Sequence, residues 1–220
     1  RLLPIFKAMA IIDSRQAYPE ILKFLNSSNQ TGHSPAYRTL AAITRRKHLP
    51  LLSQTLKQAK SYRARKYLVM LIGQIETPEV LDLLISALSD PSPYVALQAA
   101  KILGKSENSA VNERIGQLAR SHDGRLRSYA ILVAIFREER FEQKLLSGPW
   151  IPVLLKSVRS DDYFIKGTAA AALVDVGFTT DRSEIIELMD KYLVPILIDV
   201  LSGKVYFRDY IALRPTAYAK

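Results

Sequence analysis

Cysteine is absent from the 220-residue sequence, which also contains only three histidines. The missing cysteine excludes disulfide bonds, Cys-ligated zinc and a cysteine nucleophile. The histidines, His33, His48 and His122, all fall in predicted turns without a second ligand at metal-binding spacing, so we expect surface residues rather than metal ligands. We also expect no transmembrane segment, because the apolar stretch from Leu2 to Ile12 is short and is interrupted by Lys7.

Catalytic motifs are missing as well. The sequence contains no G-x-S-x-G element, no Walker loop and no Rossmann glycine pattern. Its paired acid, Asp161-Asp162, begins a predicted helix, where acids favour the positive end of the helix dipole. We therefore predict a protein without catalytic residues, cofactor or metal.

Acidic residues are scarce in the first third of the chain. Residues 1–75 hold 13 Lys and Arg against two acids, Asp13 and Glu20, whereas residues 76–150 hold 9 against 10 and residues 151–220 hold 9 against 9. This asymmetry indicates that one end faces something acidic, namely nucleic acid, a lipid surface or an acidic protein. The alternative is a basic, solvated face that serves solubility alone.

Helical periodicity is clearest from Glu76 to Ser106. Thr77 is a good N-cap, and Pro78 occupies the first helical position, where its missing N–H costs nothing. The turn Asp90–Pro93 separates this helix from a second one, for which Gly104 is a natural stop. The segment is thus predicted to form two antiparallel helices.

This helix pair recurs along the chain. The position of Ala96 is occupied by Arg65 31 residues earlier and by Arg127 31 residues later, and the equivalent positions of the outer pairs hold Arg38 and Lys166. A fixed period of this kind is the signature of a solenoid. We therefore predict an all-α fold, a right-handed α-solenoid of about five helix pairs plus terminal helices.

We expect a single domain over residues 1–220. Residues 1–33 form an N-terminal cap and first outer helix, residues 34–177 the regular repeats, and residues 178–220 a C-terminal helix and tail. The expected helices are 1–12, 18–25, 34–46, 49–59, 61–75, 78–88, 93–103, 111–120, 126–138, 140–146 with 152–158, 163–176 and 183–201. The chain opens at Arg1 rather than at methionine, which indicates a segment of a longer protein, and we expect a cytoplasmic location.

The segment Asp90–Gly104, which reads D-P-x-x-x-V-x-x-x-A-A-x-x-L-G, resembles the second helix of a HEAT-type repeat. It is most similar to the short HEAT-like variety found in phycobilin lyases. The resemblance implies an ARM/HEAT-like superhelix that binds a partner on its concave face. An enzyme of the lyase or DNA glycosylase type is a further alternative, but no residue of this sequence matches the catalytic residues of either.

The resemblance also implies that a basic residue at the Ala96 position joins a ladder with an acid in a neighbouring turn. We expect this ladder at Arg127 and Lys166, which have acids nearby. We expect it less at Arg38 and Arg65, because the turns that precede these two residues lack acids.

Basic residues interleaved with tyrosines are the best candidates for a binding site. Lys and Arg can neutralise carboxylates or phosphates, and Tyr can stack on bases. The candidate residues are Arg38, Arg45, Arg46, Lys57, Lys60, Tyr62, Arg63, Arg65, Lys66 and Arg127. We predict a scaffold that docks an acidic protein or peptide partner. The alternative is a nucleic-acid-binding protein that holds the phosphate backbone.

Overall fold

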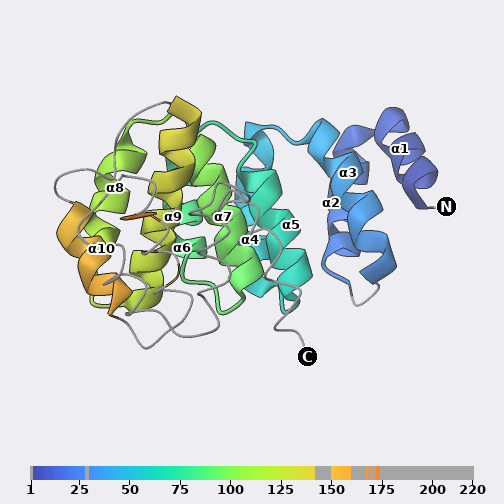
Figure 1. Ribbon diagram of the computed structural model, residues 1–220. Coiled ribbons are helices and arrows are strands. Elements are labelled where there is room, and N and C mark those ends of the chain that lie inside the picture. Colours follow the sequence, from blue (N-terminus) through green and yellow to red (C-terminus); the bar gives the residue numbers. More distant parts are fainter. Residues whose placement is uncertain are drawn as a thin grey trace. The chain divides into compact units, whose positions relative to one another are not determined.

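The computed structural model describes residues 2–27, 30–141 and 150–159, together with 167, 169, 172 and 173, and the elements it describes are helices (Figure 1). The chain divides into two compact units, Arg1–Ile102 and Leu103–Lys220, with the boundary inside one helix. The all-α prediction is confirmed, and the single domain over residues 1–220 stays a prediction.

The first unit begins with three helices that pack on one another, α1 (Leu2–Ile12), α2 (Ser14–Leu25) and α3 (His33–Ile43). The Asp13 carboxylate accepts hydrogen bonds from the backbone N–H groups of Arg15 and Gln16 and so caps α2. The predicted start at residue 18 is therefore too late, and Pro19 lies inside the helix.

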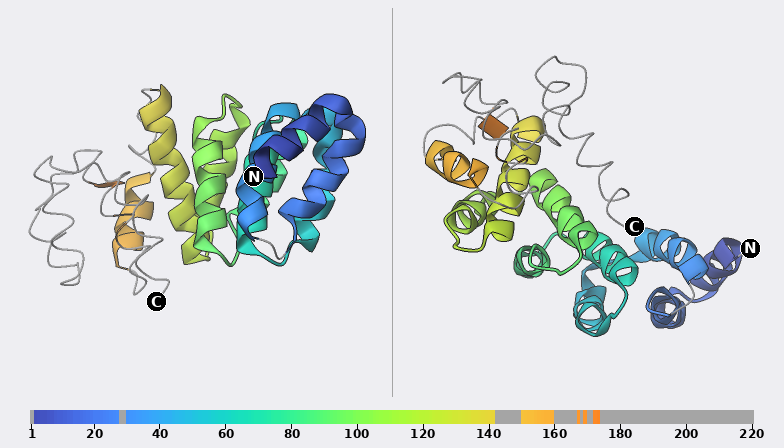
Figure 2. Two further views of the ribbon diagram at one scale, coloured as in Figure 1. Left: turned by 90° about the vertical axis from the view of Figure 1, so that its right-hand side faces the viewer. Right: turned by 60° about the horizontal axis from the view of Figure 1, so that its bottom comes forward.

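Two further pairs follow, α4 (Leu49–Gln58) with α5 (Tyr62–Ile72), and α6 (Pro78–Ala87) with α7 (Pro93–Lys105). Helix α2 packs on α3 and α4 packs on α5, while the second helices α3 and α5 pack on each other. Figure 2 shows α3 and α5 side by side in one layer and α2 and α4 in another. This is the arrangement of successive helix pairs in a repeat protein.

The connection between α3 and α4 differs from the prediction. The sequence predicts that Arg45–Lys47 closes α3, but α3 ends at Ile43 and a short 3-10 helix, η2 (Arg46–His48), leads into α4. Thr44 takes up an extended conformation, and its hydroxyl donates to the Leu40 carbonyl at 2.8 Å. Helix α3 therefore ends where the Thr44 side chain forms a hydrogen bond with a carbonyl of its last turn.

A buried hydrogen bond joins α2 to this connection. The phenol of Tyr18 donates to the Thr44 hydroxyl at 2.9 Å, since that hydroxyl uses its own hydrogen on Leu40. Burial raises the pKa of Tyr18 to about 12. The buried aliphatic side chains of the first unit include Ile21, Leu22, Leu25, Leu40, Leu52, Leu68, Leu71 and Ile72.

The second unit contains the end of α7 followed by α8 (Ala110–Ala119), α9 (Gly124–Phe141) and α10 (Ile151–Val158). Helix α9 packs on both α8 and α10. The predicted break before residue 140 is wrong, because α9 continues to Phe141. Helix α10 begins next to Pro152, as predicted.

Several predicted features fall outside the described residues. These are the second helix of the fifth pair, 163–176, apart from four helical positions, and the break at 147–149, the helix 183–201 and the C-terminal tail. Within the part of the chain that the structure describes, no helix is long and apolar enough to cross a membrane.

Gly104 does not end α7, which continues to Lys105. A Cβ atom built on Gly104 would lie 2.3 Å from the Cβ atom of Phe136 in α9. Real Cβ atoms do not approach so closely, so glycine is required at this position for the close approach of two helices. Gly116 in α8 is the opposite case, because a Cβ atom there would have nothing within 4 Å.

We predict that Gly104→Ala lowers the free energy of unfolding by about 1–3 kcal/mol, because the added methyl group overpacks the contact with Phe136. The matched control Gly116→Ala adds the same group in open space and is expected to raise it by about 0.5–1 kcal/mol. Urea unfolding measures both. Equal effects of the two substitutions would show that the close approach is not a constraint.

Candidate binding surface

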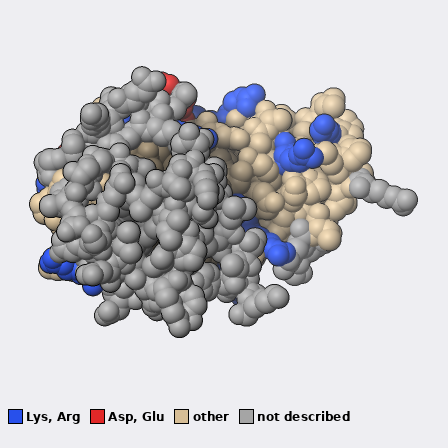
Figure 3. All heavy atoms as spheres, in the orientation of Figure 1, with Lys and Arg blue, Asp and Glu red and all other residues tan. Residues whose placement is uncertain are grey.

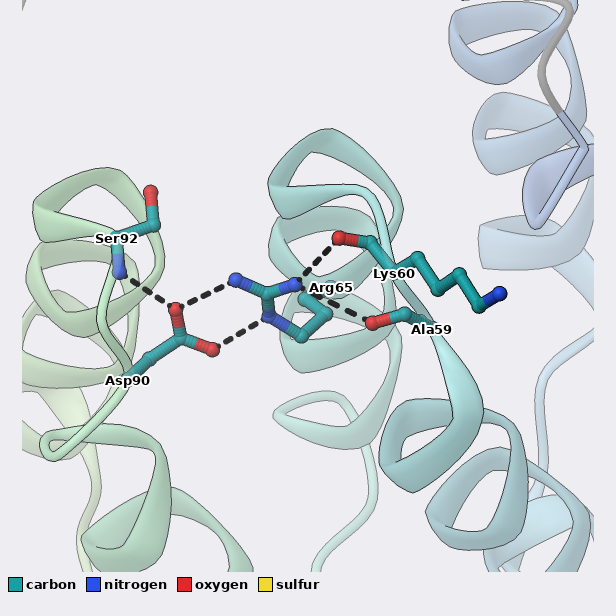
Figure 4. Close-up of polar contacts among 5 residues, drawn as sticks. All are labelled: Ala59, Lys60, Arg65, Asp90 and Ser92. Carbon is teal, nitrogen blue, oxygen red and sulfur yellow. Dashed lines mark hydrogen bonds and ion pairs between the residues drawn. The ribbon is translucent and has the colours of Figure 1, made fainter.

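Arg65 in α5 joins two turns of the first unit (Figure 4). Its Nε donates to Asp90 Oδ2 at 2.7 Å and its Nη2 to Asp90 Oδ1 at 3.0 Å. On the other side, its Nη1 donates to the carbonyl oxygens of Ala59 and Lys60 at 3.2 and 2.9 Å. Arg65 therefore ties the α4–α5 turn to the α6–α7 turn.

The ion pair between Arg65 and Asp90 is largely shielded from water, with side chains 17% and 9% exposed. The hydrogen bond to Asp90 raises the pKa of Arg65, and burial lowers this pKa by a smaller amount. Asp90 Oδ1 also accepts from the backbone N–H of Ser92 at 2.8 Å. This carboxylate thus orders its own turn and binds the preceding repeat.

The structure differs from the predicted ladder, which favoured Arg127 and Lys166 over Arg65. The acid that Arg65 binds comes from the following repeat, 25 residues later, and not from the turn before it. Arg127 donates to the carbonyl oxygens of Ser121 and His122, both at 2.9 Å. Arg65 and Arg127 thus make the same contacts, because each binds the carbonyl oxygens of the residues five and six positions before it. Lys166 lies outside the described residues.

Helix α4 separates the remaining candidates of the first unit into two groups. Arg45 and Arg46 precede its N-terminus, whereas Lys57 and Lys60 lie at its other end. A helix of 10 residues is about 15 Å long. The two groups are therefore separate sites, and Arg63 and Lys66 at the start of α5 belong with the second.

Arg45 of the first group is held by contacts within the chain. Arg45 Nη1 donates to the Thr44 carbonyl at 2.7 Å and to the Ala42 carbonyl at 3.3 Å. The backbone N–H of Arg45 donates to Nδ1 of His48 at 2.9 Å, and the His48 ring stacks on Tyr18 with centroids 3.7 Å apart. Burial lowers the pKa of His48, as do the charges of Lys47 and Arg45.

The second group lies on an acid-free part of the chain. No Asp or Glu occurs from Ile21 to Ile75, a stretch with 10 Lys and Arg. The preceding Glu20 pairs with Lys23 at 2.7 Å. In Figure 3, Lys and Arg side chains stand on the first unit, with no acidic side chain among them on the face it shows. Lys57, Lys60 and Arg63 are exposed, as is Arg38 on α3, and Lys66 is half-buried.

The candidate tyrosines form two stacked pairs between neighbouring repeats. Tyr37 of α3 stacks on Tyr67 of α5 with ring centroids 5.0 Å apart, and Tyr62 of α5 stacks on Tyr94 of α7 at 5.3 Å. Burial raises the pKa of Tyr37, with a further rise from Tyr67. Tyr62 remains 38% exposed, and Arg63 Nε donates to its hydroxyl at 3.2 Å.

Two of the histidines are placed differently from the prediction. His33 is buried, only 2% exposed, because it begins α3 and its Nε2 donates to the Ser27 carbonyl at 2.8 Å. His48 is half-buried in its stack, and His122 is exposed as predicted. Among the described residues, no group of three or more His, Asp or Glu side chains is placed to hold a metal ion.

The described helices form successive pairs whose second helices pack side by side in the first unit, which defines an all-α helical-repeat protein. Residues 49–135 match the HEAT repeat family, which is the family that the resemblance predicted. The search of curated proteins gave no match. HEAT repeats imply a helical binding scaffold, and they suggest protein partners generally.

We predict that Asp90→Asn lowers the free energy of unfolding by about 2 kcal/mol, because it leaves the shielded Arg65 without a carboxylate. Combined with Arg65→Met in a double-mutant cycle, it should give a coupling energy of about 1–2 kcal/mol in urea unfolding. The exposed pair Glu20–Lys23, whose side chains are 56% and 71% exposed, is the control and should couple by less than about 0.5 kcal/mol. Similar coupling in both pairs would contradict the structural role of Arg65.

The lowered pKa of His48 predicts a pH dependence of stability. Between its pKa in the folded state and the ordinary value of 6.5, the unfolded chain binds more protons, so stability is present above 6.5 and is lost as pH falls. His48→Gln should weaken the loss of unfolding free energy between neutral and mildly acidic pH. An NMR titration in which His48 titrates at or above 6.5 would contradict this.

Proposed function

We propose that the chain is a binding scaffold without enzyme activity, which docks an acidic protein or peptide on one surface of its first unit. This basic surface consists of Arg38, Lys57, Lys60, Arg63 and Lys66. The observation that carries the proposal is the clustering of these cations on α3, α4, α5 and the turn between α4 and α5, none of which contains an acid. Such a surface has a positive potential that attracts acidic partners and speeds their association.

The other candidate residues have different roles in this proposal. Arg65 and Arg127 bind backbone carbonyls of their preceding turns, so they position the repeats. Arg45 is turned back onto the backbone, while Arg46 lies at the far end of α4. Tyr62 supports Arg63 through its hydroxyl. The proposed contacts are therefore a subset of the basic residues of this region.

The stacked tyrosines favour a protein partner over nucleic acid. A base would need a free ring face to stack on. Tyr37 and Tyr67 each cover one face of the other's ring, and Tyr62 stacks on Tyr94 with the Arg63 guanidinium 5.8 Å from its ring centroid, so these rings offer less free area to a base. The cations of this surface can bind carboxylates without any stacking.

A polyglutamate peptide is the probe that tests this proposal, with fluorescence anisotropy as the measurement. The variant Lys57→Glu, Lys60→Glu, Lys66→Glu should weaken its binding by about tenfold or more, because three attractive contacts become repulsive. The control Arg15→Glu, Lys105→Glu, Arg120→Glu reverses three exposed cations elsewhere and gives the same net charge. This control should change the affinity by less than about threefold, since distant charges are screened.

Equal weakening by the two triple variants would contradict the proposal, because it would show that binding depends on the net charge of the chain and not on the position of the cations. Duplex DNA and single-stranded RNA form the second arm of the experiment. If either binds more tightly than polyglutamate, with affinity falling steeply as salt increases, the partner is a nucleic acid and the proposal fails.

A further inference from the structure

The outward side of α5 combines charge with fixed aromatic rings. Successive residues of an α-helix are rotated by about 100°. Arg63 and Lys66 therefore point between the directions of Tyr62 and Tyr67, opposite the buried side that includes Ala64, Leu68 and Leu71. The cations of α5 thus lie between two tyrosines of the same helix.

Both of these tyrosines are fixed by rings of neighbouring helices. Tyr67 stacks on Tyr37 of α3 with an interplanar angle of 28°, and Tyr62 stacks on Tyr94 of α7 with an angle of 26°. Arg63 is further oriented by its hydrogen bond to the Tyr62 hydroxyl. The cations are therefore presented by a rigid framework, which reduces the entropy lost when a partner binds.

Helix α3 supplies the next cation along this surface. Arg38 follows Tyr37 directly in the sequence and is exposed, and α3 packs on α5. Packed helices have axes about 8–10 Å apart. Arg38 on α3 and the pair Arg63 and Lys66 on α5 therefore lie on neighbouring helices whose axes are one spacing of about 8–10 Å apart.

We infer that this surface takes an acidic peptide in an extended, polyproline II conformation, with a carboxylate at every third residue. Such a peptide has three residues per turn and rises by about 3.1 Å per residue, so every third side chain lies on one face at steps of about 9 Å. This step matches the helix spacing, whereas a β-strand places side chains of one face about 7 Å apart. The inference rests on the proposed function and adds the spacing of the carboxylates along the acidic partner.

The test compares two peptides of identical composition, one made of Glu-Pro-Pro repeats and one with all glutamates in a single block. The repeated peptide should bind about fivefold more tightly, because all of its carboxylates lie on one face of the polyproline II helix, whereas a block of glutamates distributes its carboxylates over three faces. Arg38→Gln should remove this preference, and Lys66→Gln should reduce it. Arg15→Gln, an exposed arginine of α2, is the matched control and should preserve it. Thermal unfolding of each variant verifies that the fold is intact.

The outcomes separate this inference from the proposed function. If both peptides bind equally while polyglutamate still requires the basic surface, the spacing is wrong and the proposed function stands. If neither peptide binds and polyglutamate does not bind either, both fail. Tighter binding of a uridine oligonucleotide than of any acidic peptide also overturns both, and preference for the block peptide overturns the spacing alone.

Discussion

The hydrogen bonds of Arg65 are the constraint on which the candidate surface depends. One guanidinium joins the end of α4, the start of α5 and the turn before α7, through two backbone carbonyls and the Asp90 carboxylate. The Ala59 carbonyl and the Asp90 carboxylate are partly buried and would otherwise need another partner there. Figure 4 shows the consequence for Lys60, whose carbonyl faces Arg65 while its side chain points away. The most central arginine of the basic region thus fixes its neighbours.

The repeat architecture could be predicted because it depends on local patterns. Apolar positions at helical spacing and a period of 31 residues are visible in the sequence, and Pro78 and Pro152 mark helix starts. The ends of α2 and α3 were less predictable, because the side chains of Asp13 and Thr44 decide them through hydrogen bonds. Such bonds compete with the general helical pattern.

The ladder between repeats was expected, but sequence reasoning misplaced it. The turn before Arg65 contains no acid, and its partner Asp90 lies 25 residues later in the following repeat. A basic residue paired with an acid one repeat ahead is the signal that could have found it. The stacking of Tyr62 on Tyr94 belongs to the same class, because it depends on how α5 and α7 are placed.

The absence of acids from Ile21 to Ile75 has an energetic consequence. Like charges that remain close in the folded state repel one another, which lowers stability unless counter-charges are supplied. Asp90 supplies one for Arg65 from the neighbouring repeat. An acidic partner on the basic surface would supply others, and its binding to the folded state alone would stabilise the fold.

The most direct measurement of the central claim is an NMR titration of the isotope-labelled chain with an acidic peptide. The account predicts chemical-shift changes that saturate and that concentrate on Lys57, Lys60, Arg63 and Lys66, together with Arg38. Changes distributed evenly over all exposed lysines and arginines, or centred on α8 and α9, would contradict it.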